Sequence, residues 1–191
     1  MRSPDQHDVP GPELLRIARA SIEHGAIHDE PLPVACEALP RSLQRPAATF
    51  TSLSLDGELR GCCGSIEAVH PLAVDTAGSA FRAAYRDPRF DPVDRRDIPD
   101  LHLEVSVLSP LEAIAARSEA DLMAMLEPGT DGLLISAGVC RATFLPKVWE
   151  TLPEPQKFLE ALKVKCGLPA DVWSDDFKFF RYRTASYAER V

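Results

Sequence analysis

A thiol and a guanidinium group lie two residues apart in the stretch Leu59-Arg60-Gly61-Cys62-Cys63-Gly64. The glycines at 61 and 64 reduce side-chain bulk, as is expected where a ligand or another backbone segment comes close. A nearby cation favours the thiolate form of cysteine, which is the reactive form. We therefore take Arg60, Gly61, Cys62 and Gly64 as candidate site residues, and Cys62 as the candidate nucleophile or ligand contact. The alternative for Cys62 is a buried structural cysteine.

The pair Asp56-Gly57, just before this stretch, is typical of the tight turn of a β-hairpin. The stretch is therefore predicted to be the returning strand of a hairpin. Because side chains alternate between the two faces of a strand, we expect Arg60 and Cys62 on one face and Leu59 and Cys63 on the other. Cys63 is then expected in the core, where a free cysteine behaves as a small hydrophobic residue.

Two further charged residues are candidates for the same site. Arg89, in Asp87-Pro88-Arg89-Phe90, suits the binding of an anionic group because its guanidinium is planar; the alternative is an ion pair with a nearby aspartate (Asp87, Asp91 or Asp94). Glu104 lies on the polar face of a predicted strand. Its possible roles are a general base or a carboxylate that orients an arginine, and the alternative is a solvated side chain without a role in the site. A catalytic cysteine usually has a histidine base within reach, and His70 and His102 are the candidates.

No metal site or cofactor is predicted. Cys62 and Cys63 are expected to diverge, and no second cysteine or histidine pair completes a tetrahedral set. Sequence signatures of hydrolases, dinucleotide-binding folds and P-loops are missing. The Gly61–Gly64 segment fits the bare GXXG outline of KH domains. However, a net charge of -8 disfavours nucleic-acid binding, which depends on clustered Lys and Arg.

The composition is that of a globular protein of 191 residues. Its five cysteines are odd in number and irregular in spacing, which favours free thiols in a reducing compartment. No apolar run approaches the roughly 20 residues that cross a bilayer, and the first residues lack the layout of a signal peptide. We expect a cytoplasmic protein without a membrane anchor, with a flexible segment at 1–11 and a single domain at 12–187.

Hydrophobic periodicity and turn residues predict a mixture of helices and strands. Helices are expected over 13–24, from Pro71 to before Pro88, after a Ser118 cap, and around 158–162 with an end at Gly167. Strands are expected over 48–55, 59–64, 101–107, 132–137, 139–145 and 177–184, with a long connection at 25–47 that includes a helical turn near Cys36. Trp149 is expected to close a corner of the core.

Several strings, in this order and spacing, resemble the AMMECR domain family, whose prokaryotic members are called AmmeMemoRadiSam system protein A. They are LRGCCG (59–64), DPRF (87–90), LEVSVLSP (103–110), DGLLI (131–135), FLPKVW (144–149) and KCGLP (165–169). The resemblance implies an α+β fold of two lobes, the larger containing both termini, with an antiparallel sheet flanked by helices and a cleft between the lobes. The chain departs from the family pattern at Cys63, Ala142 and Lys147, where the family usually has isoleucine, glycine and glutamine.

The resemblance implies a function in outline only. The family name reflects association with a Memo-type protein, related to metal-dependent dioxygenases, and with a radical SAM enzyme. We therefore expect an accessory protein that binds a small substrate or a partner in its cleft, with Arg60, Cys62 and Arg89 as the site. The alternatives are an enzyme that uses Cys62 as a nucleophile, and, with less support, a nucleic-acid-associated regulatory protein.

Overall fold

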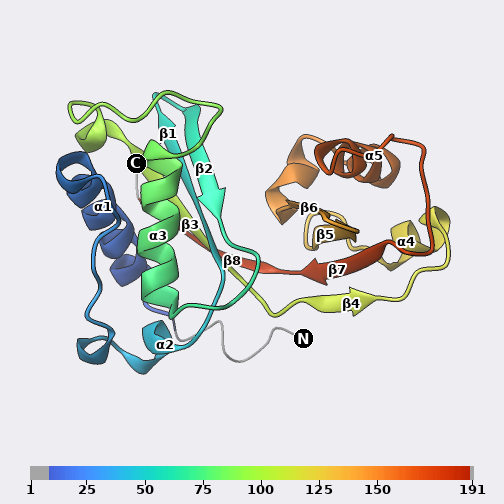
Figure 1. Ribbon diagram of the computed structural model, residues 1–191, viewed down its shortest axis with the longest axis horizontal. Helices are drawn as coiled ribbons and strands as arrows, with labels where there is room; N and C mark the ends of the chain where they lie inside the picture. Colours follow the sequence, from blue (N-terminus) through green and yellow to red (C-terminus); the bar gives the residue numbers. More distant parts are fainter. Residues whose placement is uncertain (1–8, 190–191) are drawn as a thin grey trace. The chain divides into compact units, whose positions relative to one another are not determined.

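The computed structural model describes residues 9–189, which divide into two compact units, 9–109 together with 185–189, and 110–184. Helices accompany two antiparallel four-stranded sheets, so the predicted α+β class is confirmed (Figure 1). No helix in this part of the chain is long and apolar enough to cross a membrane. The cleft between lobes stays a prediction.

The first unit contains one sheet with strand order β2-β1-β3-β8. Its helices are α1 (Gly11–His28), η2 (Cys36–Ala38), α2 (Arg41–Gln44), α3 (Leu72–Tyr85) and η3 (Ile98–Asp100), and its strands are β1 (Thr49–Leu55), β2 (Glu58–Gly64), β3 (His102–Leu108) and β8 (Thr184–Ala188). The helices α1 and α3 pack together against the sheet (Figure 1). Leucine, isoleucine, valine and alanine side chains fill the space between them.

The predicted hairpin is present. Asp56 and Gly57 both have positive φ angles, of 52° and 83°, as a tight turn between β1 and β2 requires. The buried face of β1 carries two threonines as well as leucine, and both find polar partners on α3: Thr49 bonds to Asp75, and Thr51 bonds to Ser79. Asp75 is 5% exposed and accepts hydrogen bonds from the backbone N–H and the hydroxyl of Thr49, at 2.8 and 2.7 Å, and from the hydroxyl of Ser65. These bonds satisfy a buried charge that would otherwise be costly.

The second unit contains the sheet β4-β7-β5-β6. Its elements are β4 (Glu112–Ile114), α4 (Glu119–Met125), β5 (Gly132–Ala137), β6 (Cys140–Phe144), η4 (Pro146–Glu150), α5 (Pro155–Lys165) and β7 (Lys178–Tyr182). The core corner predicted at Trp149 is confirmed, since the indole is 4% exposed and stacks on Phe158 with ring centroids 3.7 Å apart. Ser118 caps α4, and Gly167 follows α5 with a φ of 79°, both as predicted.

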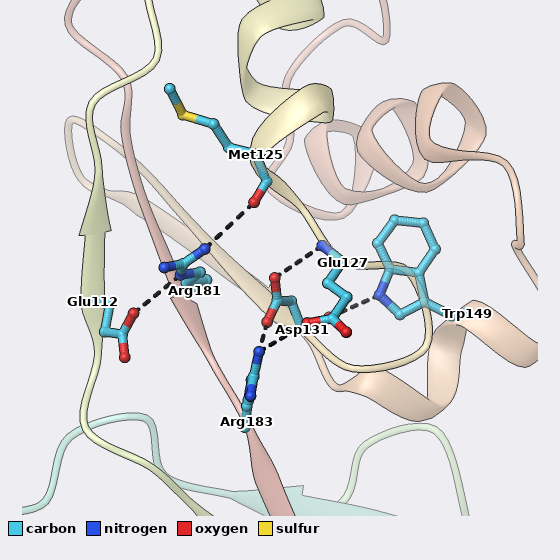
Figure 2. A network of polar contacts seen from close by, with 7 residues as sticks. All are labelled: Glu112, Met125, Glu127, Asp131, Trp149, Arg181 and Arg183. Atoms are coloured by element: carbon cyan, nitrogen blue, oxygen red, sulfur yellow. Dashed lines mark hydrogen bonds and ion pairs between the residues drawn. The ribbon is translucent and has the colours of Figure 1, made fainter. Parts of the chain in front are cut away.

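A polar network fixes the start of β5 (Figure 2). Asp131 is 1% exposed. One of its carboxylate oxygens accepts the backbone N–H of Glu127 at 2.9 Å, and the other lies 3.6 Å from the Arg183 guanidinium. Its backbone carbonyl accepts the indole N–H of Trp149 at 2.7 Å. The strings DGLLI and FLPKVW are therefore joined by a structural contact.

The structure differs from the predicted elements in three places. The helix α1 continues past residue 24, because Gly25 sits inside it and gives room to the rings of Phe81 and Tyr85. The single strand expected over 177–184 is instead two strands that belong to different sheets and meet near Arg183. The short edge strand β4 was not predicted. Of the segment expected to be flexible, residues 1–8 lie outside the described residues, and Gly11 already begins a helix.

Candidate functional site

A row of three polar side chains crosses the sheet of the first unit. Ser52 on β1 is paired with Cys62 on β2 and, on its other side, with Glu104 on β3. Directly paired residues project from the same face of a sheet. This face points away from α3, because the neighbouring Gly61 faces the helix, where an added Cβ would lie 2.0 Å from the carbonyl oxygen of Ala83. The row is therefore on the face of the sheet that α3 does not cover.

The sulfur of Cys62 is half-buried and accepts a hydrogen bond from the Ser52 hydroxyl at 3.3 Å. The neighbouring Cys63 lies on the opposite face, packed against the hydrophobic core, as predicted. Burial raises the pKa of the Cys63 thiol, and the charges of Asp87 and Cys62 add to that effect. The two consecutive thiols therefore have different environments.

The loop after α3 covers the outer edge of β2 at Cys62. The backbone N–H of Cys62 donates to the Asp87 carboxylate at 2.9 Å, and the Cys62 carbonyl accepts from the Arg89 guanidinium at 3.2 Å. Arg89 and Asp87 form a two-bonded ion pair, at 2.6 and 2.9 Å. That ion pair is the alternative weighed for Arg89 from the sequence. The guanidinium of Arg89, with burial opposing and the Cys62 N–H assisting, lowers the pKa of Asp87 to about 2.

One predicted orientation in this strand was wrong. A β-bulge lies between the pairs Leu53 with Gly61 and Ser54 with Leu59, so the alternation of side chains is interrupted at Arg60. Leu59, paired with Ser54, therefore shares the face of Cys62 instead of the opposite one, and its side chain is 47% exposed. Arg60 sits in the bulge, half-buried, and its guanidinium has no hydrogen bond or ion pair with any residue between 9 and 189.

The two candidate glycines serve the packing of the protein itself. Gly61 lets the backbone of α3 approach β2, as described above. A Cβ at Gly64 would lie 2.3 Å from the carbonyl oxygen of Thr49 and 2.4 Å from the ring of Phe50. The space that each glycine leaves is therefore filled by protein atoms. Both glycines shape the strand that presents Cys62, and their role in binding stays a prediction.

Comparisons with known proteins identify the family of this chain. The family profile described as AMMECR1 matches residues 15–187, which include every candidate residue named above. The chain belongs to the AMMECR1 family. The resemblance drawn from LRGCCG and the other strings is thus confirmed.

Relatives of this AMMECR1-family protein occur in archaea. A protein of Methanothermobacter thermautotrophicus is 34% identical over 94% of both chains, and protein MJ0810 of Methanocaldococcus jannaschii is 32% identical over 94% of this chain and 90% of its own. The crystal structure of the uncharacterized protein PH0010 from Pyrococcus horikoshii is similar with a TM-score of 0.86 and 30% identity, covering 94% of this chain and 91% of that one. These similarities fix the family and the fold.

No histidine of the described AMMECR1 chain contacts the Cys62 sulfur, whose hydrogen bond comes from Ser52. His102 is on the same face of the sheet as the polar row, but it is paired with Ser54, next to the row and not in it. His70 is exposed in the connection before α3 and does not cap that helix. Within residues 9–189, no three His, Cys, Asp or Glu side chains are arranged to hold a metal ion.

Sequence reasoning missed two residues of this AMMECR1 site. Ser52 was not considered, because a regular hairpin would have paired it with Gly61 and not with Cys62. Asp87 was named only as a partner for Arg89, yet it also binds the backbone of β2. The spacing of a sequence gives no sign of a carboxylate that caps a strand 25 residues earlier.

Proposed function

We propose that this AMMECR1-family protein is an accessory protein of the cytoplasm that binds a small substrate or a partner at the polar row around Cys62. The proposal extends to the partners implied by the family resemblance, a Memo-type protein and a radical SAM enzyme. The observation that carries it is the half-exposed side chain of Cys62 on a polar sheet face: Ser52 donates a hydrogen bond to its sulfur, and Asp87 accepts its backbone N–H at the strand edge.

The arrangement supports binding more than independent catalysis. A cysteine nucleophile is usually activated by a base within hydrogen-bond reach. The group bonded to the Cys62 sulfur is the hydroxyl of Ser52, which is a donor and not a base. The carboxylate of Glu104 is in the same row, but it belongs to β3, which is separated from β2 by β1. Neighbouring strands are about 4.8 Å apart, so the backbones of β2 and β3 are separated by roughly twice that spacing. A ligand or partner group of modest size fits such a row.

Thiol labelling tests the site directly. We expect iodoacetamide to modify Cys62 faster than Cys63 in the folded protein, because Cys63 packs against the core and burial raises the pKa of its thiol. Peptide mapping by mass spectrometry after timed exposure at pH 6–9 separates the two sites. Inert Cys62 in the folded state, together with rapid labelling after denaturation, overturns the proposal.

The partners are tested with purified proteins. The Memo-type and radical SAM proteins of the source organism are mixed with this chain and analysed by size-exclusion chromatography and calorimetry. A complex that is weakened by Cys62→Trp and unchanged by Cys140→Trp supports the accessory function, because Cys140 is an exposed thiol on the other unit. Failure of all pairwise and three-component mixtures to associate excludes it.

The alternative is a thiol-dependent enzyme, and the hydroxyl that donates to the Cys62 sulfur is the observation in its favour. Turnover by the isolated chain that is lost in Cys62→Ser and retained in Cys63→Ser supports this alternative. Association with partners, without turnover by the isolated chain, supports the accessory function instead.

A further inference from the structure

Two histidines lie one turn apart at the end of α1, in the first unit and outside the polar row. His24 and His28 have ring centroids 4.3 Å apart, with the rings tilted by 30°. The spacing of four residues is the one with which a helix presents two imidazoles to the same metal ion. The sequence segment His24-Gly25-Ala26-Ile27-His28 carries this spacing.

The carboxylate of Glu30 lies close to the two histidines. Asp29 ends the helix in the left-handed conformation, with φ of 59°, and this reverses the chain so that Glu30 approaches the histidines. A Glu30 carboxylate oxygen lies 3.7 Å from Nε2 of His24. Nε2 of His24 is itself buried and has no hydrogen-bond partner in the described residues. A buried imidazole nitrogen without a partner is uncommon and calls for an explanation.

The surroundings favour a cation. Three carboxylates belong to this end of the helix, at Glu23, Asp29 and Glu30, and the neighbouring cation Arg86 is already paired with Asp29 at 2.7 Å. The last carbonyl groups of a helix add a partial negative charge. His28, Asp29 and Glu30 are all exposed. A hydrated ion can therefore reach His28 directly, and a rotation of the half-buried His24 ring would bring one of its nitrogens to the same ion.

We propose that His24 and His28 form a binding site for a divalent transition-metal ion of the kind that prefers imidazole, such as Ni²⁺, Cu²⁺ or Zn²⁺. The two imidazoles are the protein ligands and water completes the coordination, which agrees with the finding that no group of three ligands is preassembled in residues 9–189. Glu30 acts as the outer carboxylate, accepting a hydrogen bond from a metal-bound water or a ligand N–H. Imidazole ligands with water are typical of these ions.

The test uses Ni²⁺ alone as the probe and the full chain as the protein. Calorimetry at pH 7.5, with the five thiols kept reduced and present in every variant, measures saturable binding. We expect one site per chain in the wild type and its loss in His28→Ala, which leaves the thiols unchanged. We expect Glu30→Gln to weaken binding about tenfold, as is usual for outer-shell carboxylates. The variant His70→Ala, which removes an exposed histidine elsewhere, is the matched control and should bind as the wild type does.

A second measurement keeps the result independent of folding. His28 is exposed, so His28→Ala should unfold at the same temperature as the wild type without metal, and only the wild type should gain thermal stability when Ni²⁺ is added. Equal Ni²⁺ binding by the wild type and His28→Ala overturns the proposal, as does the lack of saturable binding in the wild type.

Discussion

The carboxylate of Asp87 accepts the backbone N–H of Cys62 at 2.9 Å, although the two residues belong to a loop and a strand that are 25 positions apart. Through its ion pair with Arg89, the same carboxylate also supports the guanidinium that donates to the Cys62 carbonyl. Cys62 is in β2, the edge strand of its sheet. An exposed strand edge offers unpaired backbone groups to other chains, and here two side chains occupy them.

Asp87→Asn should therefore destabilise the fold by about 1–3 kcal/mol at pH 7, because one change weakens the ion pair and a hydrogen bond to a buried backbone group. The pKa of Asp87 is lowered to about 2 in the folded protein. Its contribution to stability is complete above the ordinary aspartate pKa of about 4 and is lost as the pH falls through 4 toward 2. Urea denaturation at pH 7 and pH 3 measures the difference.

Asp94→Asn is the control for this prediction. Asp94 and Arg96 repeat the same spacing and the same two-bonded ion pair, at 3.2 and 2.8 Å, but the pair is exposed, and its side chains form no hydrogen bond with a strand within residues 9–189. Exposed pairs contribute little to stability, so Asp94→Asn should be close to the wild type. Equal losses in both variants would show that the contact with β2 adds nothing to the stability.

Ser52→Ala should slow the alkylation of Cys62 at pH 7 by about threefold to tenfold, because the reacting sulfur loses the hydrogen bond from Ser52, which is worth about 0.5–1.5 kcal/mol. Ser54→Ala is the control, since Ser54 lies on the same face and strand but is paired with Leu59 and His102. Rates are followed by mass spectrometry with iodoacetamide in excess. If the two variants react at the same rate, the bond from Ser52 to the sulfur has no influence on its reactivity.

The pairing of Ser52 with Cys62 also shows which features of the site the sequence could predict and which it could not. Asp56-Gly57 predicted the hairpin correctly, and alternation placed Cys63 toward the core. A regular hairpin about that turn pairs Ser52 with Gly61, and only the bulge at Arg60 moves Cys62 into that position. A bulge depends on how the strand packs and twists in the folded sheet, so the sequence alone could not give the partner of the thiol.

Contacts between segments distant in the sequence were the other part that could not be predicted. The motif DPRF offered Arg89 either to a ligand or to a nearby aspartate. Nothing in the motif indicated that Asp87 and Arg89 would both bond to the backbone of Cys62, which lies 25 and 27 positions earlier. Near the C-terminal end, the alternation of side chains predicted one strand, but the chain forms two strands, β7 and β8, in different sheets. Hydrophobic periodicity indicates which side chains are buried and does not indicate which strand lies alongside.

Gly61→Ala should destabilise the protein by about 3 kcal/mol, because the added methyl would lie 2.0 Å from the carbonyl oxygen of Ala83 and would push α3 from the sheet. Gly78→Ala tests the same substitution inside α3. There the nearest atom is the movable end of Arg82, at 3.1 Å, and replacing a helical glycine with alanine gains up to about 1 kcal/mol. The midpoint of chemical denaturation should therefore fall for Gly61→Ala and rise for Gly78→Ala. An unchanged midpoint in Gly61→Ala would refute the close packing of α3 on β2.

Arg19 on α1 ties three segments of the first unit together, and its loss should be costly. Its guanidinium donates to both carboxylate oxygens of Glu189, at 2.8 and 2.6 Å, and to the backbone carbonyls of Ile98 and Leu101, at 2.8 and 2.7 Å. Arg19→Ala should lower the free energy of unfolding by about 2–3 kcal/mol, because it removes charged hydrogen bonds and leaves partly buried acceptors without a donor. Arg16→Ala makes the same change in helix propensity on the same helix.

The side chain of Arg16 is 64% exposed, and among residues 9–189 it pairs only with Glu13, one turn away. Such helix pairs contribute about 0.2–0.5 kcal/mol, so Arg16→Ala should be nearly silent in urea denaturation. Hydrogen exchange adds a local readout: in Arg19→Ala, the amide of Glu189, which donates to the carbonyl of Leu103 at 3.1 Å, should lose protection before the amides of β1 do. Unchanged protection at Glu189, with unchanged stability, would show that α1 and the end of β8 are held together without Arg19.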